Sequence, residues 1–437
     1  MSNRLKSLLA STAPSVSVEE QQNKAVAKPQ PQVDLTGPAL EHADAQLDLA
    51  MVGVEHADHD VNELIEIASG LESIHVAASA TIPEGGLKRA AASMMHVAVE
   101  GYANRLGLEE AMVPSIESFG SEGEAMTATQ VSVEGIKDTI KRVWEAVQAA
   151  LVKAIEAVKA WFTKFFVNAE KIKARAEAVK ASVKDKTGDA EEAKVSVGGA
   201  VAKLHKGGKL ASVSAVAAEV KGILGDVMAA HDGLVKTAGE LGDMVAKVVD
   251  EDATKGAELV TAAGLKLIEA PELFKGALDL KERTEAGEKA YYSDELPGGK
   301  VVKMQVGEKS YSASLQDAGK VEIADADKEV TTLPVADIES LCDVVVECAD
   351  DLAGAKEKVF DKASATKDDL LKAGKDASGK LKDDTDKAVA DNTQSMVRML
   401  PTFTRMVDQP AMALLAHSAK ALGGVLDIAA ASAKQYK

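Results

Sequence analysis

Apolar residues recur at helical spacing along most of this chain, and this periodicity constrains the fold more than any other feature. The clearest run is a seven-residue repeat formed by Leu40, Leu47, Val54 and Val61, with Ala43, Ala50, Ala57 and Leu64 between them. Such a repeat places its apolar positions on one face of a helix. It predicts a helix over 38–69, ended by Gly70, and a second helix over 87–106 that completes a helical hairpin.

Most later segments repeat the helical pattern, with one exception. We expect a loop over 107–131 and a long helix over 134–184 with Ser132 as its N-cap. Further helices are expected over 212–231, 233–250 and 335–360, and then over 393–435 with breaks at Pro401 and Pro410. Between 290 and 333, short β-branched and aromatic runs alternate with glycine turns, which predicts about four short strands.

The fold class that follows is mainly α: a helical bundle with long helices and a small antiparallel β insertion at about 290–333. Aromatic residues make up only 3% of the chain, so the core must consist largely of Ala, Val and Leu. The expected divisions are a disordered N-terminus (1–37), an acidic helical segment (38–122), a helical domain led by a basic amphipathic helix (123–289), the β insertion (290–333) and a C-terminal helical region (334–437).

Charge is distributed unevenly along the chain. The whole protein carries a formal charge of −18. Residues 1–122 contain 7 basic and 18 acidic side chains, whereas residues 135–187 contain 12 basic and 6 acidic ones. An acidic first quarter is therefore followed directly by a basic stretch, which indicates either separate roles for the two sections or two solvated surfaces of opposite sign that attract each other.

Several function classes find no support in the residues. The chain has no glycine-rich phosphate loop, no nucleophile-elbow motif and no paired metal-binding cysteines, so we expect neither an enzyme nor a cofactor. His56 and His59 have a spacing that suits a metal, but a third ligand is not evident and a solvated acidic face explains them better. Cys342 and Cys348 are ~240° apart on a helix, so we expect two buried thiols that do not pair. No uncharged run is long enough to predict a transmembrane helix.

The basic stretch can be interpreted in three ways. It contains both tryptophans, Trp144 and Trp161, among apolar residues three and four apart. It fits a core helix of the bundle, an amphipathic helix on a membrane surface, or a surface that contacts nucleic-acid phosphates. The first and third are compatible, and the cations that would contact phosphates are Lys137, Lys141, Arg142, Lys153, Lys159 and Lys164.

The junction between the acidic and basic sections resembles a known family. It runs from Pro114-Ser-Ile-Glu-Ser-Phe-Gly-Ser-Glu-Gly123, through Ser132-Val-Glu-Gly135, to Trp161-Phe-Thr-Lys-Phe-Phe166. Over about 112–180 this is similar to the internal head (inner body) proteins of phiKZ-like giant tailed bacteriophages. The resemblance implies an N-terminal propeptide that directs the protein into the prohead, where a prohead protease removes it after a Ser/Ala/Gly-x-Glu motif. The mature part would remain in the capsid with the genome.

The resemblance also indicates where processing would occur. The candidate substrate motifs end at Glu122, Glu117 and Glu134, in that order of preference, and begin with Gly120, Ser115 and Ser132. Because Ser132 is the expected helix cap, the motif that ends at Glu134 is less accessible than the two in the loop. Cleavage after Glu122 would remove a section with a net charge of −11.

We therefore expect a non-enzymatic virion protein, made in the host cytoplasm and located in the capsid interior. The expected partners are other phage head proteins, the prohead protease as the enzyme that cleaves it, and packaged DNA, with the protein present as an oligomer or in many copies. The acidic segment 38–106 would either cover the lysines of 137–173 before cleavage or bind only scaffold proteins. The alternatives are a membrane-surface helical protein and a coiled-coil adaptor.

Overall fold

A computed structural model describes residues 37–108, 113–274, 278–285, 288–319, 328–381 and 385–437. These residues are mainly helical with small antiparallel sheets, so the expected fold class is confirmed. They form two compact units: unit 1 contains residues 52–157, and unit 2 contains residues 37–51 and 158–437. All but the last residue of the expected disordered N-terminus lies outside the described residues.

Unit 1 is a set of helices. In chain order these are α2 (Gly37–Thr81) from residue 52 onwards, η3 (Ile82–Glu84), α3 (Arg89–Leu106), η4 (Ile116–Phe119) and α4 (Glu122–Val183) up to residue 157. The predicted heptad positions are buried here, as expected for a seam. The core side chains include Val54, Val61, Leu64, Ile67, Leu71, Met95, Val99, Leu106, Ile136, Val143 and Leu151.

Gly70 does not end the first helix, as the sequence had suggested. α2 continues to Thr81, and Gly70 lies within it. A Cβ atom at this position would overlap the ring and hydroxyl of Tyr102 on α3. The glycine is therefore explained by a close approach between two helices, a contact made through residues far apart in the sequence.

The loop predicted over 107–131 is too long, and Ser132 is not an N-cap. α3 ends as expected at Gly107, whose φ of 68° is the left-handed conformation that suits a glycine at this place. The next long helix already begins at Glu122. Ser132 is buried within this helix, and its hydroxyl donates to the carbonyl of Ala128 at 2.7 Å.

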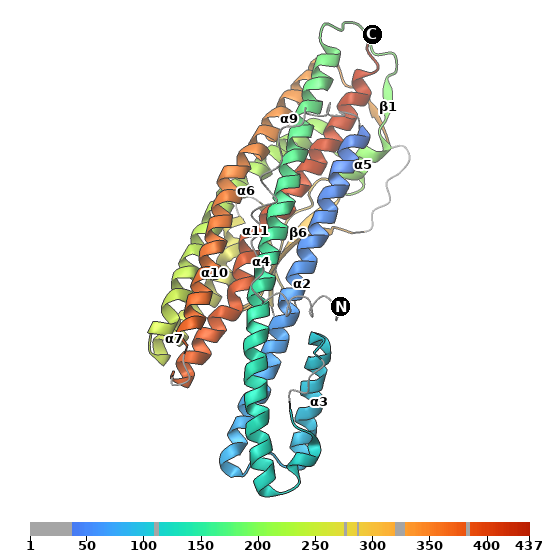
Figure 1. Ribbon diagram of the computed structural model, residues 1–437. Coiled ribbons are helices and arrows are strands. Elements are labelled where there is room, and N and C mark those ends of the chain that lie inside the picture. The colour runs from blue at the N-terminus through green and yellow to red at the C-terminus, as the bar shows by residue number, and fades with distance from the viewer. Residues whose placement is uncertain (1–36, 109–112, 275–277, 286–287, 320–327, 382–384) are drawn as a thin grey trace, which may run out of the picture. The chain divides into compact units, whose positions relative to one another are not determined.

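Unit 2 is built around one long helix, α11, which Figure 1 shows among the other helices of the unit. α11 packs against α5, α6, α7, α9, α10 and strand β7. The helices of this unit, besides residues 37–51 of α2 and the last part of α4, are α5 (Gly198–Leu204), α6 (Val213–Lys247), η5 (Val248–Asp250), α7 (Ala253–Glu269), η6 (Ala270–Phe274), α9 (Val335–Ala355), the π-helical turn η8 (Lys356–Asp361), α10 (Lys362–Lys380) and α11 (Lys387–Ala433).

Three predicted helix breaks are absent. The segments expected at 212–231 and 233–250 form the single helix α6, followed by η5. α11 runs through both Pro401 and Pro410, although proline removes a backbone donor and crowds the preceding turn. The β6–β7 hairpin binds the helix beside these positions. The Thr402 hydroxyl donates to the carbonyl of Lys309, and the Ala313 N–H donates to the side-chain carbonyl of Gln409.

α11 is also the one helix of the described residues with the length and apolar composition to cross a membrane. Of its most apolar window, 83% is buried within the fold. In this structure it is the core helix of unit 2.

The β insertion is a four-stranded antiparallel meander with the order β4-β5-β6-β7. Its strands are β4 (Lys281–Glu285), β5 (Glu288–Tyr292), β6 (Lys300–Val306) and β7 (Tyr311–Asp317), and β5 and β6 are joined through Gly298 and Gly299 at positive φ. The sheet begins at Lys281, earlier than the predicted 290. The prediction missed β4 because this charged edge strand lacks the alternation of apolar residues that indicates a strand. The last expected strand, β8 (Glu329–Thr331), instead pairs with β1 (Lys194–Ser196), and β2 (His205–Lys206) pairs with β3 (Lys209–Leu210).

Candidate processing segment, basic helix and polar network

The segment that joins α3 to α4 contains two of the three candidate motifs. Val113 and Phe119 are buried and anchor the segment, whereas Ser115 and Glu117 between them are exposed. In the described part of this segment, residues 113–121, the regular structure is the single 3-10 turn η4, in which the Ser118 N–H donates to the carbonyl of Ser115 at 3.0 Å. A protease needs to open little structure to bind this segment in an extended form.

The second motif, Gly120-Ser-Glu122, meets the first residue of α4. The carbonyl of Ser121 accepts the N–H of Ala125, and its hydroxyl donates to the carboxylate of Glu124 at 2.6 Å. Ser121 therefore occupies the N-cap position through its carbonyl, while its hydroxyl bonds to the side chain of Glu124. The spacing of Ser121 and Glu124 is a sequence signal for a helix start, and the prediction of Ser132 as the N-cap overlooked it.

The third motif lies inside α4. Glu134 is exposed, but Ser132 is buried and the preceding turns are packed. The hydroxyl of Thr129 accepts the N–H of Leu87, and the Cβ position of Gly86 lies 2.7 Å from the carbonyl oxygen of Ala125. Extended binding at Glu134 would require these turns of α4 to unfold, so the structure separates this motif from the other two.

The side chains predicted to contact phosphates differ in their solvent exposure. Lys137, Lys141 and Arg142 are exposed, as are Lys153 and Lys164. Lys159 is half-buried, and its Nζ lies 3.9 Å from Asp368 on α10.

The segment 38–106 was expected to cover lysines of α4, but acidic side chains elsewhere in unit 2 already pair with some of the lysines of this helix. The Nζ of Lys173 donates to Asp350 on α9 at 2.6 Å, and Lys180 pairs with Asp343 on the same helix. Together with the Lys159–Asp368 pair, this brings acids of α9 and α10 to the last part of α4. These lysines therefore have acidic partners that do not belong to 38–106.

The aromatic residues of α4 occupy a core position. Trp161, Phe162 and Phe165 are each no more than 1% exposed, and the rings of Trp161 and Phe165 stack at 5.3 Å. Phe162 also packs against Phe360 of the π-helical turn η8 at 5.1 Å. In unit 1, the indole N–H of Trp144 donates to Glu72 at 2.8 Å. Buried rings cannot serve as an interfacial anchor, so the core interpretation of this helix is confirmed and the membrane alternative loses its main support.

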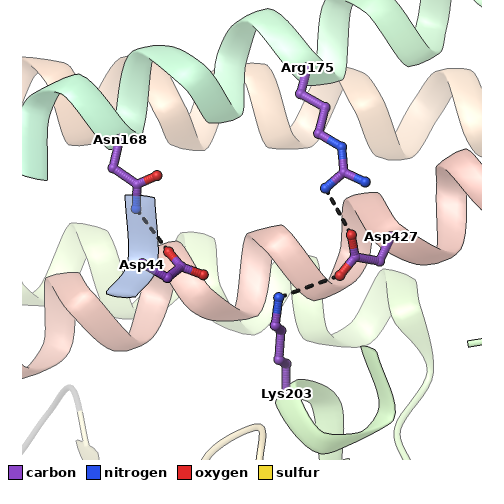
Figure 2. A network of polar contacts seen from close by, with 5 residues as sticks. All are labelled: Asp44, Asn168, Arg175, Lys203 and Asp427. Carbon is purple, nitrogen blue, oxygen red and sulfur yellow. Dashed lines mark hydrogen bonds and ion pairs between the residues drawn. The ribbon is translucent and has the colours of Figure 1, made fainter. Parts of the chain in front are cut away.

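A polar network within unit 2 connects the first turns of α2 to the rest of that unit (Figure 2). The side-chain amide of Asn168 on α4 donates to Asp44 on α2 at 3.0 Å. Burial raises the pKa of the Asp44 carboxyl, although the Asn168 bond opposes that shift. Nearby, Asp427 on α11 accepts from Arg175 on α4 at 2.8 Å and from Lys203 on α5 at 3.4 Å.

Further contacts hold the same part of α2. The Nζ of Lys420 on α11 lies 2.7 Å from Asp48. Leu40, Ala43 and Leu47, which are the first heptad positions, are buried here. Residues 37–51 are therefore an integral part of unit 2, although they precede the candidate processing segment.

The described part of the chain contains neither a metal-binding cluster nor an exposed cysteine. Within it, no group of three or more His, Cys, Asp or Glu side chains is placed to hold a metal ion, and His56 and His59 are exposed on α2. Cys342 and Cys348 are buried thiols that do not form a disulfide, as predicted. Burial raises the pKa of each to about 11, which keeps them protonated and unreactive at neutral pH.

Comparison with known families gives one match. The family model of phiKZ-like phage internal head proteins matches residues 42–431. The chain belongs to this family. The match includes α2 and α3 as well as unit 2, so the acidic segment is part of the pattern that these internal head proteins share. The protein is thus a structural component of the phage head, located inside the virion and associated with other head components.

Neither the curated proteins nor the solved structures gave a match to this internal head protein.

Proposed function

We propose that this internal head protein is made as a precursor, that a prohead protease removes its N-terminal section, and that the remainder stays in the capsid with the genome. The observation that carries the proposal is the position of two motifs, Ser115-Ile-Glu117 and Gly120-Ser-Glu122, in the short connection between two long helices of a phage internal head protein. Synthesis would take place in the host cytoplasm.

The local structure favours Glu117 and Glu122 over Glu134 as cleavage points. Cleavage after Glu117 requires the opening of one 3-10 turn, and cleavage after Glu122 requires fraying of the first turn of α4. Helix ends open far more readily than packed helix interiors. Mature protein would then begin at Ser118 or Gly123.

Cleavage alone would not detach the N-terminal section. Residues 37–51 are held in unit 2 by the buried Leu40 and Leu47, by the Asp44–Asn168 bond and by the Asp48–Lys420 pair. A cut at 117 or 122 leaves all of these contacts intact. Departure of this section would therefore need further proteolysis or a competing partner, and a nicked complex is the expected intermediate.

The test is the intact mass and the N-terminal peptide of the protein from purified virions. We expect a chain that begins at Ser118 or Gly123, with peptides from 37–106 depleted. A double variant, Glu117→Gln with Glu122→Gln, should leave a larger species, and the matched control Glu134→Gln should be processed normally. Full abundance of the 37–106 peptides in virions would refute the proposal, whereas a mature terminus at Gly135 would refute only the preference for Glu117 and Glu122.

We further propose that the exposed cations of α4 contact DNA phosphates. The candidates are Lys137, Lys141, Arg142, Lys153 and Lys164, and acids such as Glu145 and Glu156 are interspersed among them on the exposed surface. Binding should therefore be weak and local.

Neutralisation of about four to six phosphates would give a slope of log K against log salt of about −4 to −5. Filter binding or fluorescence anisotropy measures this slope when the protein is titrated onto duplex DNA at salt concentrations from about 25 to about 200 mM. A flat response would refute phosphate contact. Binding to anionic vesicles without binding to DNA would favour the membrane alternative.

A further inference from the structure

The outer face of α3 carries an exposed apolar seam. It consists of Ala90, Met94, Val97 and Gly101, which follow one another at intervals of four, three and four. Met94 is 77% exposed and Val97 is 67% exposed, and a Cβ atom at Gly101 would meet no other atom within 4 Å. The opposite face of α3 is already buried in unit 1 through Ala92, Met95, Val99 and Leu106. This alternation of three and four is the spacing with which one helix packs along another.

The seam is self-complementary when two copies meet in antiparallel orientation. If the two-fold axis passes between Met94 and Val97, Met94 of one copy faces Val97 of the second copy. In the same register, Ala90 faces Gly101 of the second copy. The long side chains thus meet at the centre and the small ones at both ends, where they allow the backbones to approach.

The residues beside the seam suit the same orientation. On one side, Ala91 and Ala98 are small and exposed, so they do not obstruct a second helix. On the other side, Arg89 is exposed near the start of α3 and Glu100 lies near its end, 62% exposed and 3.4 Å from His96 of its own helix. Antiparallel packing brings Arg89 near Glu100 of the second copy, whereas parallel packing leaves these two side chains at opposite ends of the helix pair.

We propose that α3 is a self-association surface, through which two copies of this chain pair by antiparallel packing of the seam Ala90-Met94-Val97-Gly101. The contact is small: one helix face falls below the ~1,200 Å² of total buried area that is usual for a stable complex. It should therefore be weak in dilute solution and effective where many copies are concentrated. It concerns the uncleaved chain and does not depend on the proposed processing, although removal of α3 would abolish it.

Disulfide trapping in the full-length protein tests the contact and its direction. Two single variants are prepared, Met94→Cys and Val97→Cys. Under mild oxidation, a mixture of the two should give cross-linked dimer at least several-fold faster than either variant alone. Leu265→Cys, at another exposed apolar position (53% exposed, on α7), supplies the collisional background, and the buried native cysteines should contribute little. Faster cross-linking within each single variant would overturn the antiparallel register, and rates equal to the Leu265→Cys background would overturn the contact itself.

Sedimentation equilibrium provides a second readout without cysteines. The weight-average mass of the native chain should rise with protein concentration, and Val97→Lys should suppress that rise while the control Leu265→Lys does not. Arg89→Glu alone should weaken the association, and the added Glu100→Arg should restore it. A concentration-independent monomer mass for the native chain, or failure of the double charge exchange to restore association, would refute the proposal.

Discussion

The ion pair between Lys367 on α10 and Asp408 on α11 should be the most sensitive polar contact of unit 2. Their side chains are only 1% and 6% exposed, and the Nζ–Oδ2 distance is 2.7 Å. Burial raises the pKa of the Asp408 carboxyl, and the neighbouring ammonium of Lys367 opposes that rise. Two charges in an apolar core are tolerated because each neutralises the other, so neither can be removed alone without a large cost.

The expected magnitudes follow from this burial. Lys367→Met leaves an unpaired buried carboxylate and should lower the free energy of unfolding by about 3–5 kcal/mol at pH 7. The double variant Lys367→Met with Asp408→Leu removes both charges at similar volume, and its stability should lie within about 1–2 kcal/mol of the native value or above it. The loss in the single variant should shrink at low pH, because the unpaired Asp408 can then take up a proton.

Urea denaturation followed by tryptophan fluorescence measures these differences. A Trp144→Phe background leaves Trp161, which is fully buried in unit 2, as the reporter of that unit. The matched control is Lys362→Met, which breaks the exposed pair between Lys362 and Asp232 (55% and 60% exposed, 2.9 Å) and should cost no more than about 1 kcal/mol. Equal losses for Lys367→Met and Lys362→Met, or a double variant as unstable as the sum of its singles, would refute the reasoning.

Three further predictions concern histidine, glycine and leucine positions elsewhere in the chain. Burial lowers the pKa of His231 and of His417 to about 4, so the unfolded chain binds protons more readily below pH 6.5. The contribution of these histidines to stability should be constant above that pH and should be lost as the pH drops from 6.5 towards 4, by up to about 3 kcal/mol for each histidine. Urea midpoints that do not change between about pH 7.5 and about pH 5 would contradict this. Gly70→Ala should destabilise unit 1 by about 1–3 kcal/mol through the clash with Tyr102, whereas Gly53→Ala on the same helix, where a Cβ meets nothing within 4 Å, should be neutral or stabilising by up to about 1 kcal/mol; thermal unfolding followed by circular dichroism compares the two. Leu47→Ala should destabilise unit 2 by about 2–5 kcal/mol and Leu49→Ala, 71% exposed, by less than about 0.5 kcal/mol, and equal urea midpoints in the Trp144→Phe background would show that residues 37–51 do not support that unit.

Local signals determined much of this fold. The heptad spacing of α2, the end of α3 at Gly107 and the alternation in β5 to β7 were all readable from the sequence, because each depends on residues within a few positions of one another. The candidate processing motifs were identified through the resemblance to the family. The motif that ends at Glu134 was already expected to be the least accessible. Its position well inside α4 was not expected, because the predicted helix start was Ser132 and the helix begins at Glu122.

Tertiary contacts decided the features that local rules misjudged. Gly70 reads as a helix stop, yet the helix continues because Tyr102 from α3 occupies the space beside it. Pro401 and Pro410 read as breaks, yet α11 passes through both while it packs in the core of unit 2, where the β6–β7 hairpin bonds to the adjacent side chains. Lys367 lies in a Lys/Asp-rich stretch that is typical of a solvated surface, but a partner 41 residues away allows its burial. In each case, the contact that stabilises the observed structure is made with a residue distant in sequence. A pattern of neighbouring residues cannot predict such a contact.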